Sequence, residues 1–123
     1  MTSPIGTKQQ GNILIFSVEG ELSSFLLDTL KHEIVRKVRE EKITRIIVNL
    51  DKVDYLMSKD LGAFVQIFRF LVSEVDSGIG TEAVLAFCCV DEFVDEVFKM
   101  TKLDTVFKVY ATENDAVEAL SCN

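Results

Sequence analysis

The stretch that decides the fold is Arg45–Val65, RIIVNLDKVDYLMSKDLGAFV. Its first part, with Thr44 before it, is a run of apolar and β-branched residues up to Leu50, which is typical of a central strand buried on both faces. Its last part begins an apolar repeat with helical spacing, at Leu61, Phe64, Val65, Phe68, Leu71, Val72 and Val75. We therefore predict a strand, a loop and a helix, with Ser58 where the helix starts.

The segments on either side of this stretch alternate between strand and helix patterns. Short apolar runs bounded by turn residues predict further strands, at Pro4–Lys8, Ile13–Val18, Glu82–Val90 and Asp104–Tyr110. Apolar residues at helical spacing predict helices from Ser23 or Ser24 to Lys42, over Glu92–Met100 with Asp91 as its cap, and over Glu113–Leu120. In the first of these helices, the stripe is made of Leu27, Leu30, Ile34 and Val38, while Phe25, Leu26 and Val35 lie beside it.

The order of these elements predicts an α/β fold. An initial hairpin followed by alternating helices and strands implies a mixed, mostly parallel sheet of about five strands, covered by about four helices. We find no internal repeat, linker or low-complexity segment, so we predict one domain over residues 1–123.

The composition excludes several classes of function. The chain has 13 basic and 20 acidic residues, a formal net charge of -7, and an acidic domain repels the phosphates of nucleic acid. The longest uncharged apolar run, Ala83–Val90, is much shorter than the roughly 20 residues of a membrane-spanning helix. The first ten residues lack a basic segment followed by an apolar one, so we expect no secretion signal and a cytoplasmic protein.

The residues that commonly carry catalysis or bind metals are few. The only histidine, His32, falls on a predicted helix, without a second ligand at metal-binding spacing. Cys88 and Cys89 are neighbours in a predicted strand, where we expect their side chains to point to opposite faces, and with Cys122 they make an odd number that favours reduced thiols. No phosphate-binding or dinucleotide-binding glycine motif occurs. We therefore predict no metal, no cofactor and no enzymatic activity, and keep a small-molecule-binding α/β domain as an alternative.

Two roles fit Ser58, and the sequence leaves both open. As an N-cap, its hydroxyl would accept a hydrogen bond from the first turn of the helix, which is worth about 1 kcal/mol. As a phosphorylation site, it would hold the phosphate at the positive end of the helix dipole, beside the charge of Lys59. The carboxylate of Asp60 would oppose that phosphate.

Three segments in this order resemble the STAS domain of bacterial anti-sigma factor antagonists. They are VEGELSSFLLDTLKHEI (Val18–Ile34), the stretch Arg45–Val65 around Ser58, and VDEVFKMTKLDTVFKVYATENDAVEAL (Val94–Leu120). The resemblance extends over nearly the whole chain. The family's serine motif usually has the sequence Asp-Ser-(Ser/Thr)-Gly-Leu-Gly, and here the aligned residues are Met57, Ser58, Lys59, Asp60, Leu61 and Gly62.

The resemblance implies a regulator that acts by partner switching. Such a protein, when dephosphorylated, binds an anti-sigma factor kinase, which then releases its sigma factor; the kinase contributes ATP, magnesium and the catalytic base. It implies Ser58 as the phosphorylated residue. Because the flanking residues differ from the motif, a STAS scaffold that is never phosphorylated is an alternative.

The resemblance also implies where the partner binds. We expect it to contact the serine, the residues around it and the loop before the first long helix, namely Met57, Ser58, Lys59, Asp60, Gly62, Ser23 and Ser24. Phe70 lies off the apolar stripe of its helix and is predicted to be exposed. Beyond the kinase we expect at most a weak homodimer.

Overall fold

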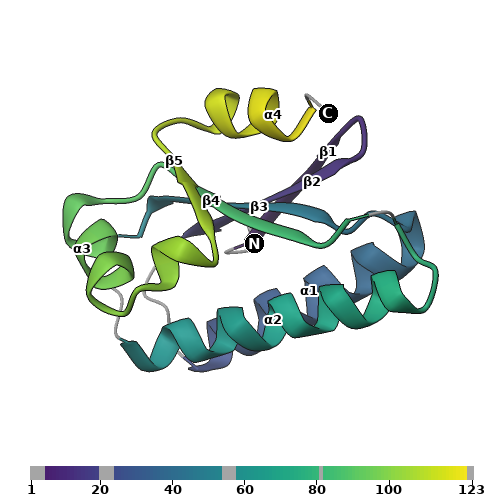
Figure 1. Cartoon of the computed structure of the whole chain (residues 1–123), viewed down its shortest axis with the longest axis horizontal. Coiled ribbons are helices and arrows are strands. Elements are labelled where there is room, and N and C mark those ends of the chain that lie inside the picture. Colours follow the sequence, from purple (N-terminus) through teal and green to yellow (C-terminus); the bar gives the residue numbers. More distant parts are fainter. Residues whose placement is uncertain (1–4, 20–23, 54–57, 81, 122–123) are drawn as a thin grey trace.

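The computed structural model describes residues 5–19, 24–53, 58–80 and 82–121. This part of the chain folds as one α/β domain, as predicted, with a helix between each pair of successive parallel strands (Figure 1). Its elements are β1 (Ile5–Gln10), β2 (Ile13–Glu19), α1 (Ser24–Glu41), β3 (Arg45–Lys52), α2 (Ser58–Asp76), β4 (Val84–Cys88), α3 (Glu92–Met100), the short 3-10 helix η1 (Leu103–Thr105), β5 (Lys108–Tyr110) and α4 (Glu113–Ser121).

The strands lie in the sheet in the order in which they occur in the chain, β1-β2-β3-β4-β5. The first two form the predicted antiparallel hairpin, with Ile5 opposite Val18 and a turn at Gly11, and the other neighbours are parallel. Because each right-handed crossover adds the next strand at the same edge, α1, α2 and α3 fall on one face of the sheet, and α4 covers the other (Figure 1). The starts of α1, α2 and α3 therefore all lie at the carboxyl end of the parallel strands.

Two apolar cores follow from the alternation of side chains along the strands. In β2, Leu14 and Phe16 point into the large core under α1, α2 and α3. Ile13 and Ile15, which alternate with them, point into the smaller core under α4, where they meet Ala116 and Leu120. The inner strands are thus buried on both faces, which is why their sequences are apolar without interruption.

The helical stripes that the sequence predicts are confirmed in α1, where Leu27, Leu30, Ile34 and Val38 are all buried. Leu26 is buried beside them, whereas Phe25 is 80% exposed. In α2, Leu61, Phe64 and Leu71 are buried, with Ile67 as a further core residue that the predicted stripe omits and Val72 exposed.

An aromatic cluster fixes α2 and α3 to the middle of the sheet. The ring centroid of Phe87 on β4 lies 4.9 Å from that of Phe64 on α2 and 5.0 Å from that of Phe98 on α3. The ring centroid of Phe107, which lies just after η1, is 5.5 Å from that of Phe87. These rings are fully buried, so α2 and α3 are held against one shared residue.

Two predictions about this region are wrong. The predicted last strand, Asp104–Tyr110, is shorter, because its first residues belong to η1 and only Lys108–Tyr110 pair with β4. Phe70 is half-buried rather than exposed, because it packs against the large core and the guanidinium of Arg39 lies 5.4 Å from its ring centroid.

Candidate functional site

The candidate site is at the start of α2. Strand β3 ends at Lys52, and α2 begins at Ser58, at the carboxyl end of the sheet (Figure 1, lower left). Ser58 is the first residue of α2, and because the residues just before it lie outside the described part of the chain, its predicted N-cap role stays a prediction. The free N–H groups of a helix's first turn and the positive end of its dipole lie at this position.

Several of the predicted partner contacts lie outside the described residues. Met57 and Ser23 lie there entirely. Ser24, Ser58 and Lys59 are described as the first residues of α1 and α2, while their side chains lie outside the description. Their contacts with a partner stay predictions.

Asp60 is buried, with 6% of its surface exposed, although the sequence predicts it as a partner contact. It lies in the first turn of α2, where a carboxylate is favoured by the helix dipole. Asp60 also makes a polar contact within the chain. The structure thus indicates that Asp60 stabilises the start of α2 from within.

Gly62 is exposed on the second turn of α2, and the described residues give no steric reason for a glycine there. Its conformation is not left-handed, and a Cβ added to it would meet no atom within 4 Å. Glycine in a helix interior is less stable than alanine by about 1 kcal/mol. The bare backbone at this point leaves room for a molecule to approach α2 from outside.

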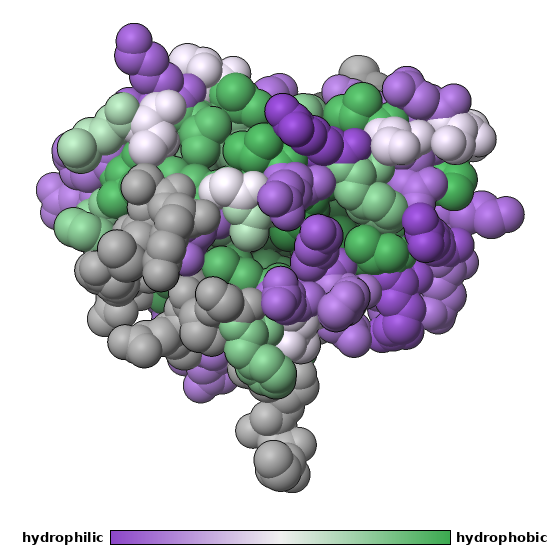
Figure 2. Space-filling model, turned by 90° about the horizontal axis from the view of Figure 1, so that it is seen from below, coloured by the Kyte–Doolittle hydropathy of each residue, from purple (hydrophilic) through white to green (hydrophobic). Residues whose placement is uncertain are grey.

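Exposed apolar side chains accompany this end of the sheet. Phe25 stands in the first turn of α1, which begins next to α2, and Met100 is 79% exposed on α3. Figure 2 shows the molecule from the side of α1 and α2, where hydrophobic side chains emerge between hydrophilic ones.

The two neighbouring cysteines lie on the same side of the sheet, which contradicts the prediction that they point to opposite faces. Cys88 ends β4 and is buried in the core under α4. Cys89 has a left-handed backbone, with φ at 59°, and this turns its side chain towards the same core. Burial, and then the neighbouring Cys89, raise the pKa of the Cys88 thiol well above its ordinary value, so this thiol is unreactive.

A polar contact joins the start of α4 to the face of the sheet that it covers. The carboxylate of Glu113 accepts hydrogen bonds from Nζ of Lys8 at 2.5 Å and from Nδ2 of Asn49 at 3.1 Å. Partial burial raises the pKa of Glu113, but the hydrogen bonds from Lys8 and Asn49 outweigh it, so the pKa lies below its ordinary value. This contact fixes the start of α4 against β1 and β3.

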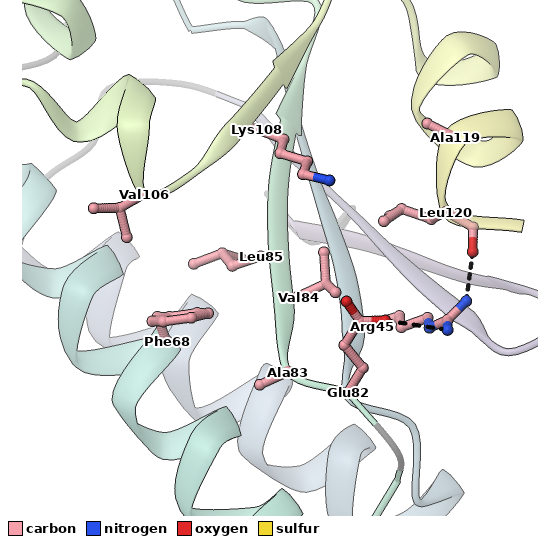
Figure 3. A pocket seen from close by; sticks show the side chains of 10 residues that line it. All are labelled: Arg45, Phe68, Glu82, Ala83, Val84, Leu85, Val106, Lys108, Ala119 and Leu120. Carbon is pink, nitrogen blue, oxygen red and sulfur yellow. Dashed lines mark hydrogen bonds and ion pairs between the residues drawn. The ribbon is translucent and has the colours of Figure 1, made fainter. Parts of the chain in front are cut away.

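A pocket of about 220 Å³ lies at the opposite end of the strands from Ser58 (Figure 3). Arg45 crosses it, donating to the backbone oxygen of Leu120 at 2.5 Å and pairing with Glu82 at 3.3 Å. A cation next to the last carbonyls of α4 is favoured by the helix dipole. The role that we assign to Arg45 is to hold α4 against the sheet. The pocket beside it is smaller than most sites that bind small molecules.

The described residues provide no metal-binding group of three or more histidine, cysteine or acidic side chains. His32 is exposed on α1, as expected for a surface residue. None of the described helices combines the length and the apolar character that a membrane crossing requires.

The STAS domain family matches residues 4–116. This match covers most of the chain, so the chain belongs to the STAS domain family, as its sequence motifs suggest.

Solved structures with the same fold include anti-sigma factor antagonists. A candidate antagonist from Thermotoga maritima is 24% identical, with 94% of this chain and 92% of that chain covered and a TM-score of 0.78. An antagonist from Mycobacterium paratuberculosis is 20% identical over 97% of both chains, with a TM-score of 0.74. The phosphorylated form of the Bacillus cell fate determinant SpoIIAA is 17% identical over 94% of this chain and 98% of that chain, with a TM-score of 0.66. At these identities the likeness concerns the fold.

Proposed function

We propose that this protein is an anti-sigma factor antagonist that acts by partner switching in the cytoplasm. It binds an anti-sigma factor kinase when Ser58 is dephosphorylated, and phosphorylation of Ser58 ends the complex. Membership of the STAS family and the fold shared with anti-sigma factor antagonists support this proposal. In this role the protein binds and is modified, and it catalyses no reaction itself.

The observation that carries the proposal is the exposed backbone of Gly62, one turn after Ser58 in α2. A kinase has to bring its active site close to the residue that it phosphorylates. The open space around Gly62 allows that approach without a steric clash. Met57, Lys59, Ser23 and Ser24 are the further contacts that we propose, while Asp60 supports the helix from inside.

The position of Ser58 also suits a phosphate. At the first residue of α2, a phosphate would lie near free backbone N–H groups and the positive end of the helix dipole, which stabilises it by about 1 kcal/mol. The added charge of nearly −2 would then face any partner that approaches this end of the helix. This is the physical basis on which phosphorylation would release the kinase.

A second candidate function is a STAS scaffold that binds its partner permanently. It is favoured by the motif itself, in which Lys59 and Asp60 replace a hydroxyl residue and a glycine of the family. The buried carboxylate of Asp60 lies in the same turn as Ser58 and opposes an added phosphate. In the scaffold, binding at the start of α2 is the same, but no phosphate is added.

The test begins with a pull-down from the native host with the dephosphorylated chain, and the captured anti-sigma factor is then purified. Its affinity is measured for the wild type, Ser58→Ala and Ser58→Asp. We expect Ser58→Ala to bind like the wild type and Ser58→Asp to bind about tenfold more weakly, because the added charge is desolvated in the interface.

The matched control is Ser73→Asp, which places the same charge on an exposed position of α2 about 22 Å further along the helix. We expect this variant to bind like the wild type. Equal binding of Ser58→Asp and wild type, or the absence of any anti-sigma factor among the captured proteins, would contradict the proposed function.

A further inference from the structure

Helix α3 carries an apolar stripe that the core covers only in part, since Val97 packs against the large core while Phe93 and Met100 remain exposed. Phe93, Val97 and Met100 recur at i, i+4 and i+7, and so lie along one side of the helix. Phe93 is 49% exposed and Met100 is 79% exposed, while Val97 is half-buried. The residues that fix α3 to the sheet are Val94 and Phe98, which are fully buried on another side of the helix.

This stripe is bordered by negative charge. The segment Asp91–Met100 contains four acidic residues and one lysine, Lys99, which gives a net charge of −3 (one minus four). Lys99 pairs with Asp95 at 3.0 Å, whereas Glu92 and Glu96 form no ion pair within the described residues. We call Phe93, Val97 and Met100, together with Glu92 and Glu96, the α3 surface.

Helix α3 lies at the same end of the molecule as the start of α2. Figure 1 shows α3 at the left end of the molecule, directly above the first turns of α2. Phe98 of α3 and Phe64 of α2 both pack on the ring of Phe87. This shared contact in the core fixes the position of the two helices relative to each other. A protein that contacts the backbone at Gly62 therefore binds at the end of the molecule where α3 lies.

The charge decides which kind of molecule fits the α3 surface. A second copy of this chain would bring another −3 to the contact and −7 in total, and like charges opposite one another oppose binding. Nucleic acid and anionic membranes are repelled for the same reason. A basic protein surface that also carries apolar side chains matches both the carboxylates and the stripe, and methionine adapts well to such a contact.

We propose that the α3 surface is a second part of the partner interface, and that it receives a basic, apolar-bearing face of the anti-sigma factor that binds at the start of α2. This inference rests on the proposed function, because one partner has to cover both helices. Phe93 and Met100 are the apolar anchors, and Glu92 and Glu96 pair with lysine or arginine side chains at the edge. Binding of the partner is thus shared between a region that phosphorylation changes and one that it leaves unchanged.

The first experiment removes the apolar anchors. The double variant Phe93→Ser/Met100→Ser is titrated with the purified anti-sigma factor, and Val72→Ser is the matched control, since Val72 is an exposed apolar residue in the second half of α2. We expect the double variant to lose affinity by about tenfold or more, and Val72→Ser to keep it. Thermal unfolding and circular dichroism of each variant establish that it is folded.

The second experiment removes charge and leaves the anchors in place. Glu92→Gln/Glu96→Gln is compared with Glu118→Gln, which changes an exposed carboxylate on α4, across the sheet. We expect the double variant to associate several-fold more slowly at low salt, and the difference to disappear at high salt, because exposed charges act mainly on the rate of encounter.

The outcomes separate this inference from the proposed function. If the anti-sigma factor binds the wild type and Ser58→Asp weakens it, but both α3 variants bind normally, the α3 inference is overturned and the proposed function stands. If no anti-sigma factor binds the wild type, both are overturned. If light scattering shows a dimer that Met100→Ser dissociates, the α3 surface binds a second copy and our choice of occupant is wrong.

Discussion

The substitution Gly62→Ala should separate the stability of this protein from its binding function. Gly62 is exposed within α2, has no left-handed conformation, and has no atom within 4 Å of where a Cβ would lie. Alanine should therefore fit without strain and stabilise the folded chain by up to about 1 kcal/mol, from its higher helix propensity. For a domain of this size, that corresponds to a rise in Tm of roughly 3–6 °C.

The same methyl group should weaken binding to the anti-sigma factor. If a partner packs against the bare backbone of Gly62, an added methyl group overpacks the contact, which costs about 1–2 kcal/mol. We therefore expect the affinity to fall roughly five- to thirtyfold in an isothermal titration. A variant that is more stable but binds less well is the expected result.

The matched control is Ser73→Ala, which also raises helix propensity at an exposed position of α2, about 16 Å further along the helix. We expect it to raise Tm slightly and to bind like the wild type. A Gly62→Ala protein that is destabilised would show that the glycine has a structural role. Unchanged affinity would show that no partner approaches the backbone there, and would refute the reasoning.

Two further substitutions test the packing of the fold. Gly80 has φ at +71°, and its Cβ would clash with Oγ1 of Thr44, so Gly80→Ala should lower the free energy of unfolding by about 1–3 kcal/mol in a urea titration, opposite in sign to Gly62→Ala. An unchanged midpoint would contradict the geometry of this turn. The pKa of Glu113 is lowered in the folded state, so its pairing with Lys8 stabilises the fold above the carboxylate's ordinary pKa and is lost as the pH falls through its folded value. Glu113→Gln should therefore cost about 1 kcal/mol at pH 7 and little below pH 4, unlike the exposed Glu118→Gln, and a loss that is independent of pH would contradict the ion pair.

Most of the fold could be predicted from the sequence, because the signals are local and agree with one another. The runs in β2 and β3 are buried on both faces, and the stripe from Leu27 to Val38 turns inward. Asp91 caps α3, accepting a hydrogen bond from the backbone N–H of Phe93 at 2.8 Å. Each of these sequence patterns is compatible with only one local structure, so the prediction did not depend on tertiary contacts.

The errors occur where tertiary contacts decide between two compatible structures. Val106 and Phe107 alternate like a strand, but the backbone N–H of Phe107 bonds to the carbonyl of Leu103, and its ring enters the large core, so η1 replaces the first half of the predicted strand. Cys89 could not be placed correctly, because a left-handed backbone in a residue other than glycine has no sequence signal here.

The candidate site was predictable in part. The position of Ser58 at the start of a helix follows from the apolar repeat that begins at Leu61. The burial of Asp60 and the open space around Gly62 depend on how α2 lies on the sheet, which the sequence pattern does not specify. The exposed stripe on α3 is present in the spacing of Phe93 and Met100, but the same spacing would also fit a buried face.

The most direct test of phosphorylation at the start of α2 is the intact mass of the protein after incubation with ATP, magnesium and its anti-sigma factor kinase. We expect the wild type to gain the mass of one phosphoryl group, and Ser58→Ala, folded to the same Tm, to gain none. A phosphoryl group on Ser58→Ala, or a wild type that binds the active kinase and remains unmodified, would contradict the switch.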